Sequence, residues 1–248
     1  MKLNVRQVLS ESASFYKENF KNLMGISFMV FIFTASVQVM GHMQTMLKGY
    51  LLWLLLFILV MLAVEILVII FFPRLFLSML VLINSLLDKN KMTMKEAYRQ
   101  TKGKYWLMVG CSALIALCYI PGIVLVLYTK IPFAALINSI YIAFITSLYY
   151  TVLPMIAIEP RTGRYLRRSI QMIKGNYISV LILTLITTTI LAAINGVMTY
   201  IFQGKPTGLL VIGAIYKIVY FFVYPFSSTV TVIAYRYLKG SQKQDIVS

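Results

Sequence analysis

The stretch "RRSIQMIKGNY", residues 167–177, places three basic side chains directly before a long apolar run. Two related stretches, "SESASFYKENF" at residues 10–20 and "KEAYRQTKGKY" at residues 95–105, also precede apolar runs. In each copy a lysine follows a small residue by five positions and an apolar residue by eight, and precedes an aromatic residue by three. The aligned residues are Lys17, Lys102 and Lys174; Ser12, Ala97 and Ser169; Leu9, Met94 and Leu166; and Phe20, Tyr105 and Tyr177.

This register predicts three short amphipathic helices. Such a helix lies in the membrane interface, with its apolar face toward acyl chains or the helix bundle and its cations toward anionic headgroups. The aromatic residue that follows suits the headgroup boundary, where the chain turns into the membrane. We therefore expect a set of basic residues to face lipid or a partner on the cytoplasmic side. These are Lys17, Lys102, Lys104, Arg164, Arg167, Arg168 and Lys174.

The composition predicts a polytopic membrane protein. Of the 248 residues 60% are hydrophobic and 12% are charged, with a mean hydropathy of +0.84, whereas a soluble domain is about 25% charged. The net charge of +16 does not indicate nucleic-acid binding, because the basic residues lie between apolar runs and no nucleic-acid motif accompanies them.

We predict an all-α fold with six transmembrane helices, each near the roughly 20 residues that cross a bilayer. The predicted spans are 23–40, 50–72, 105–128, 132–158, 177–202 and 209–235. Prolines 121, 154 and 225 are expected to kink the third, fourth and sixth spans. Residues 73–90 continue apolar beyond the second span, and the sequence leaves open a buried or interfacial helix after a kink at Pro73, or a short re-entrant hairpin.

The distribution of positive charge predicts the orientation. Of the 23 lysines and arginines, 19 lie outside the short connectors and the sixth span; the others are Lys48, Lys130, Lys205 and Lys217. The positive-inside rule then places both termini and the long connectors in the cytoplasm of a multi-pass cell-membrane protein.

The three amphipathic stretches suggest a repeat of one interfacial helix and one transmembrane hairpin, with units at 1–90, 91–160 and 161–240. The alternative is that every cytoplasmic connector needs positive charge and a boundary aromatic, so that the three copies arose independently.

The stretches "SESASFYKENFKNLMGIS" and "LPMIAIEPRTGRYLRRSIQMIKGNYISVLIL" resemble the glycerophosphoryl diester phosphodiesterase membrane-domain-like proteins. The resemblance implies a six-helix membrane architecture. It does not imply the phosphodiesterase activity, because the soluble catalytic barrel of some members has no counterpart in this chain.

Two charged residues lie within predicted spans, where burial of charge is costly and often functional. Glu65 lies in the second span and Lys217 in the sixth, and a pair between them would mark a solute pathway. Alternatively, Lys217 extends to the external surface and Glu65 makes one structural hydrogen bond. Glu159, beside the basic cluster, is expected to form a surface ion pair.

The external turn "VMGHMQTM" gathers soft ligands that suit Cu(I) or Ag(I), namely Met40, His42, Met43 and Met46. Methionine is also common at membrane boundaries, so we predict no metal site from this pattern alone. With one histidine and no phosphate-binding glycine loop, the sequence predicts no enzyme and no cofactor.

Two functions remain open from the sequence. The first is a transport-associated or permease-like component for a lipid-like, peptide or amphipathic solute, working with a separate ATPase or another membrane subunit. The second is a non-transporting interaction protein, such as a peptide-toxin immunity factor or a lipid or protein scaffold.

Replacing Glu65 by glutamine tests the first function. We expect Glu65→Gln to impair solute movement and leave expression intact, because the variant removes the charge without changing the shape of the side chain. Unchanged flux in membrane vesicles would count against a role for this carboxylate.

Overall fold

The computed structural model describes residues 2–32, 51–128, 134–160, 163–187 and 208–247, and all regular secondary structure in these ranges is helical. The labelled helices are α1 (Val5–Glu18), α3 (Leu51–Leu87), α4 (Met94–Gln100), η2 (Lys102–Lys104), α5 (Tyr105–Tyr128), α6 (Ala134–Leu148), α7 (Val152–Ile158), α8 (Tyr165–Ile173) and α10 (Gly208–Val247). Two more helices, Phe20–Ile32 and Tyr177–Thr187, follow α1 and α8.

Four of the described helices are long and apolar enough to cross a membrane, and the number is five if one bent pair counts as a span. Large apolar side chains such as Leu59, Leu117 and Ile140 point outward from these helices, as expected for contact with lipid. The third predicted span coincides with α5. Parts of the first and fifth spans lie outside the described residues, so the total of six spans stays a prediction.

The fourth predicted span is divided. Helix α6 ends at Leu148, and α7 begins at Val152 after a turn. Pro154 explains the break, because a proline within a continuous helix would lose one backbone hydrogen bond and clash with the carbonyl group of Tyr150. Placed instead in the first turn of a new helix, it has no such cost. Pro73, Pro121 and Pro225, in contrast, lie inside unbroken helices.

Residues 73–87 form neither a separate helix nor a hairpin, because α3 continues through Pro73 as one helix of 37 residues. At about 1.5 Å per residue it is roughly 55 Å long, well beyond the hydrocarbon thickness of a bilayer. Its second half is buried, with Leu77 and Ile83 fully enclosed. The re-entrant hairpin is therefore wrong. The predicted burial of this segment is confirmed, but the helix begins at Leu51 and not after Pro73.

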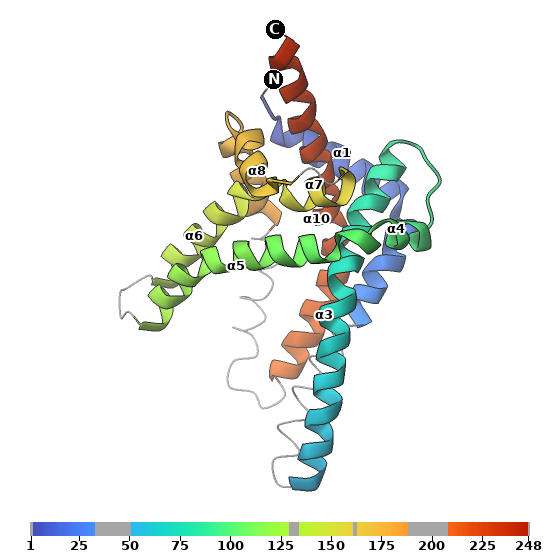
Figure 1. Cartoon of the computed structure of the whole chain (residues 1–248), viewed down its shortest axis with the longest axis vertical. Helices are drawn as coiled ribbons and strands as arrows, with labels where there is room; N and C mark the ends of the chain where they lie inside the picture. The colour runs from blue at the N-terminus through green and yellow to red at the C-terminus, as the bar shows by residue number, and fades with distance from the viewer. Residues whose placement is uncertain (1, 33–50, 129–133, 161–162, 188–207, 248) are drawn as a thin grey trace.

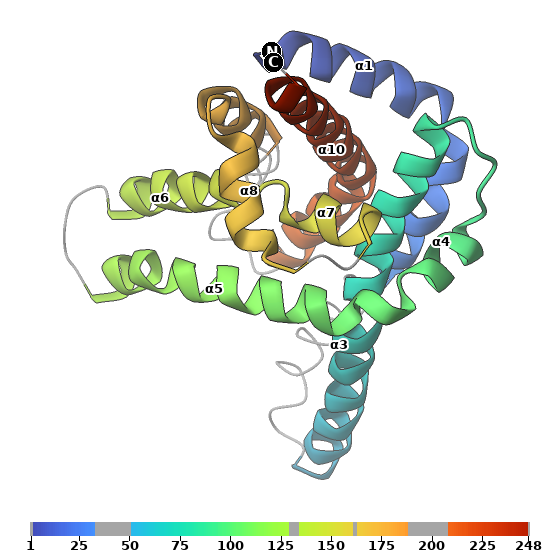
Figure 2. The same ribbon diagram turned by 45° about the horizontal axis from the view of Figure 1, so that its top comes forward.

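The core lies where the second half of α3, the short helix α7 and the second half of α10 meet. The three amphipathic helices surround this core: α1 packs on α10, α4 on α3, and α8 on α7 and α10 (Figure 2). Arg74 of α3 makes two contacts with Tyr98 of α4. Its guanidinium group donates to the Tyr98 carbonyl oxygen at 3.2 Å, and its Cζ atom lies 3.9 Å from the centre of the Tyr98 ring.

Helices α5 and α6 run side by side and diverge from α3 and α10 in both views (Figures 1 and 2). The two chain ends lie close together (Figures 1 and 2), and Leu3 and Leu238 line the same small cavity.

The three aligned stretches occupy matching environments. Ser12, Ala97 and Ser169 are completely buried. The lysine five positions later is exposed in each copy. A small residue at the buried position lets each amphipathic helix approach the core closely while its lysine stays at the surface.

The chain turns sharply after α8. The chain bends by 106° between helices Tyr165–Ile173 and Tyr177–Thr187. Gly175 lies in this turn with φ +88°, a conformation that glycine adopts without steric cost. The "KGN" element thus redirects the chain from the amphipathic helix into the following apolar helix.

Replacing Gly122 by alanine should destabilise the α5–α6 pair. A methyl group there would overlap the side-chain oxygen of Asn138 and lie 2.9 Å from the ring of Tyr141, and overpacking of this kind costs about 1–3 kcal/mol. Thermal unfolding in detergent measures the loss. Gly110→Ala is the matched control, because a methyl group on that glycine of α5 meets nothing within 4 Å. Equal stability of the two variants would show that the close approach is not required.

Candidate functional site

A buried carboxylate joins three helices at the end of the core. Glu159 follows α7 and its side chain is 5% exposed. Its oxygen atoms accept a hydrogen bond from the Tyr235 hydroxyl at 2.6 Å and form ion pairs with Arg168 at 2.8 Å and with Lys239 at 2.9 Å. Tyr235 and Lys239 belong to α10 and Arg168 to α8, so this one side chain connects α7, α8 and α10. We call these four residues the Glu159 cluster.

A fifth residue supports the cluster through the backbone. The Lys104 ammonium group donates to the carbonyl oxygens of Ala157 at 2.7 Å and of Glu159 at 3.0 Å. These carbonyls are at the C-terminal end of α7, where the helix dipole favours a cation. The amphipathic segment before α5 is thereby fastened to the same point.

Burial and hydrogen bonding act on the Glu159 carboxyl in opposite directions. Burial alone raises its pKa, but hydrogen bonds from Tyr235, Lys239 and Arg168 outweigh that effect and hold the pKa below the usual value of 4.5. The group is therefore an anion at neutral pH. The prediction that Glu159 forms a surface ion pair is therefore wrong, because its carboxylate is buried and is bound by three donor side chains.

The seven predicted basic residues divide into two groups. Lys104 and Arg168 point inward and bind Glu159 or its neighbouring carbonyl. The other five are exposed: Lys17, Lys102, Arg164, Arg167 and Lys174. These five, which we call the exposed cations, are placed on or beside the three amphipathic helices.

The two predicted intramembrane charges belong to helices that pack on each other, Glu65 to α3 and Lys217 to α10. Lys217 is half-buried. The side chain of Glu65 is outside the described part of the structure, so the pair stays a prediction. Met40, His42, Met43 and Met46 also fall outside the described residues. Within the described ranges, no group of three or more His, Cys, Asp or Glu residues could hold a metal ion.

A cavity of about 370 Å³ lies among the apolar helices, near the point where α5 and α6 diverge from α3 and α10. Its lining residues come from α3, α5, α6, the turn between α6 and α7, α7 itself, the helix Tyr177–Thr187, and α10. Nine of the twelve carry a hydroxyl group and none carries a charge. They are Phe76, Ser112, Ile115, Tyr119, Thr146, Tyr149, Tyr150, Leu153, Thr184, Thr187, Ser227 and Thr231. We call this space the hydroxyl cavity.

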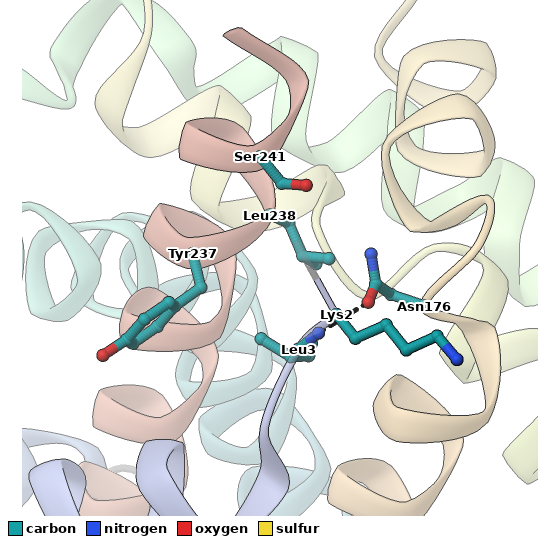
Figure 3. Close-up of a pocket in the computed structure, with 6 residues that line it drawn as sticks. All are labelled: Lys2, Leu3, Asn176, Tyr237, Leu238 and Ser241. Atoms are coloured by element: carbon teal, nitrogen blue, oxygen red, sulfur yellow. Dashed lines mark hydrogen bonds between the residues drawn. The ribbon is translucent and has the colours of Figure 1, made fainter. Parts of the chain in front are cut away.

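A second, much smaller space lies where the chain ends meet. Lys2, Leu3 and Asn176 line one side of it, and Tyr237, Leu238 and Ser241 of α10 line the other (Figure 3). The Leu3 amide donates to the Asn176 side-chain oxygen at 2.6 Å. The volume of about 10 Å³ holds at most one water molecule, so this is a packing seam and not a ligand site.

Neither the Glu159 cluster nor the hydroxyl cavity was predicted from the sequence. A signal for the cavity exists, because Ser112, Ile115 and Tyr119 recur at helical spacing, as do Ser227 and Thr231. Glu159 has no comparable local signal, since its partners are up to 80 residues away along the chain.

Comparison with protein-family models, with curated protein sequences and with solved structures finds no match.

Replacing Glu159 by glutamine should destabilise the protein at neutral pH and weaken the dependence of its stability on pH in the acidic range. The variant leaves Arg168 and Lys239 without their anion, which lowers the free energy of unfolding by about 1–3 kcal/mol. Because the folded-state pKa of Glu159 is below 4.5, its contribution is complete above that pH and is lost as the pH falls through the folded-state pKa. Thermal unfolding of both proteins between pH 7 and pH 3 measures this.

The exposed residue Glu18 supplies the control, and Glu18→Gln should leave the unfolding temperature unchanged at neutral pH. If Glu159→Gln matched wild type at pH 7, the cluster would not hold the helices together.

Proposed function

We propose that this protein is a transport-associated membrane component that accepts a lipid-like, peptide or other amphipathic solute in the hydroxyl cavity. The observation that carries the proposal is a space of about 370 Å³ among the apolar helices, lined by nine residues that carry a hydroxyl group and by no charged residue. Ligand pockets typically measure about 300–1,000 Å³. Polar groups within membrane helices are costly unless they find hydrogen-bond partners, either within the protein or in a bound solute.

The proposed orientation places both chain ends and the Glu159 cluster at the cytoplasmic side of the cell membrane. It is supported by the excess of Lys and Arg in the long connectors and by the contact of the two ends in one seam. On this orientation the hydroxyl cavity lies deeper in the bilayer than the cluster, and the solute would enter between the diverging helices.

We further propose that the chain consists of three related units, 1–90, 91–160 and 161–240, in line with the resemblance to the glycerophosphoryl diester phosphodiesterase membrane-domain-like proteins. The support is the equal burial of Ser12, Ala97 and Ser169 and the position of each amphipathic helix immediately before an apolar helix. The last labelled helices of the three units, α3, α7 and α10, meet in the core.

A second function is favoured by a separate observation, the exposed cations on or beside the three amphipathic helices. A surface of this kind suits a protein that holds an anionic leaflet or another membrane subunit, an ATPase included, without moving a solute. This function uses the outer surface, so obstruction of the hydroxyl cavity would leave it intact.

Filling the cavity tests transport directly. We expect Ser112→Trp to reduce flux to the level of protein-free liposomes, because the indole would occupy the space that the solute needs. Proteoliposomes are assayed with three fluorescent probes: a phospholipid, a monoacylglycerol and a cationic peptide. Ala113→Trp is the matched control, since Ala113 neighbours Ser112 on α5 but is exposed and does not line the cavity. If wild type moves none of the three probes, or both variants move them equally well, the transport proposal fails.

A further inference from the structure

Several hydroxyl groups that line the hydroxyl cavity donate their protons within the protein. A serine or threonine hydroxyl has one proton to donate and two lone pairs that accept. Thr146 donates its proton to the carbonyl of Ile142 at 2.8 Å, Thr187 donates to Leu183 at 3.0 Å, and Thr231 donates to Ser227 at 2.9 Å. These threonines therefore present oxygen lone pairs, and not protons, to the cavity.

Counting protons also identifies the donor in the hydrogen bond between Tyr119 of α5 and Thr146 of α6. The hydroxyl oxygens of Tyr119 and Thr146 are 2.9 Å apart, and either could be the donor on distance alone. Because the one proton of Thr146 is given to Ile142, Tyr119 must be the donor. The proton of Tyr119 is thus also used within the protein, and its oxygen is a further acceptor at the cavity wall.

Tyr150 supplies the complementary group. Its hydroxyl oxygen is buried and, within the described residues, makes no hydrogen bond. A buried hydroxyl without a partner is costly, and a bound molecule that accepts its proton would remove that cost. The wall therefore offers several acceptors and at least one donor, without any charged side chain.

These properties select among ligand chemistries. A carboxylate or phosphate would meet acceptor oxygens and no cation. An ammonium group could donate to the threonines but could not accept from Tyr150, and it would be buried without an anion. A hydroxyl group both donates and accepts. Phe76, Ile115 and Leu153 add an apolar part to the wall, against which a hydrocarbon segment can pack.

We propose that the hydroxyl cavity binds an uncharged amphipathic molecule with at least two free hydroxyl groups, as in the headgroup of a monoacylglycerol. This inference rests on the proposed function, since it specifies the solute class of the same cavity. The hydroxyls of the ligand donate to the threonine oxygens and accept from Tyr150, while the start of its acyl chain lies against the apolar part of the wall.

Equilibrium binding to the purified full-length protein in nanodiscs tests the proposal, with three probes that share an oleoyl chain. Monoolein carries two free hydroxyls, methyl oleate has no hydrogen-bond donor, and oleate is anionic. We expect saturable binding of monoolein, detected by native mass spectrometry, and weaker binding of the other two. Equal binding of monoolein and methyl oleate would overturn the proposal.

Matched variants locate the binding. Thr231→Val removes one acceptor from the wall and should weaken monoolein binding about fivefold, the effect of one neutral hydrogen bond. Thr229→Val is the control, because Thr229 is on the same helix and makes the same kind of bond, to Pro225 at 2.8 Å, but does not line the cavity. Tyr150→Phe gives a second, independent loss should Thr231→Val fail to fold. Equal binding by all three variants and wild type would refute the assignment.

Ligand binding and transport can fail independently of each other. Selective monoolein binding without flux of any probe would sustain this inference and refute transport. Flux that Ser112→Trp blocks, without selectivity for monoolein, would sustain transport and refute this inference.

Discussion

The Glu159 carboxylate imposes the condition on which the arrangement of helices depends. An anion that is 5% exposed is tolerated only when donors compensate for the water it has lost. Its donors come from α8 and α10, and Lys104 binds the adjacent backbone from the segment before α5. The carboxylate can therefore be buried only after these segments have assembled. Helices that are distant in sequence become mutually dependent at one point.

Fastening the helices at one end leaves them room to separate at the other. Helices α5 and α6 leave the core as a pair (Figure 1), and the hydroxyl cavity is close to the point of divergence. The threonines around it satisfy their own protons within their helices, so polar oxygens can face an apolar environment at little cost. A space with these properties can hold a neutral molecule without the strong electrostatic trapping that a charged wall would cause.

The amphipathic helices connect this interior to the surface. A small buried residue in each, Ser12, Ala97 or Ser169, permits close packing on the core, and the neighbouring lysine then has no route inward and stays exposed. Arg168 and Lys104 are the exceptions, because an anion and helix-terminal carbonyls lie within their reach. The cations of the basic segments thus fall into two groups, since some hold the helices together and others are exposed at the surface.

The sequence alone determined the all-helical class, the bounds of α5, and the positions of the three amphipathic helices. Periodicity and apolar run length are local properties, and they decide which segments become helices. The tertiary structure decided the continuity of α3 through Pro73, the break before α7, the burial of Glu159 and the hydroxyl cavity. Each of these depends on which helix faces meet, and that is set by contacts between residues far apart along the chain. A buried acid and a surface acid have the same local sequence, and only their packed neighbours distinguish them.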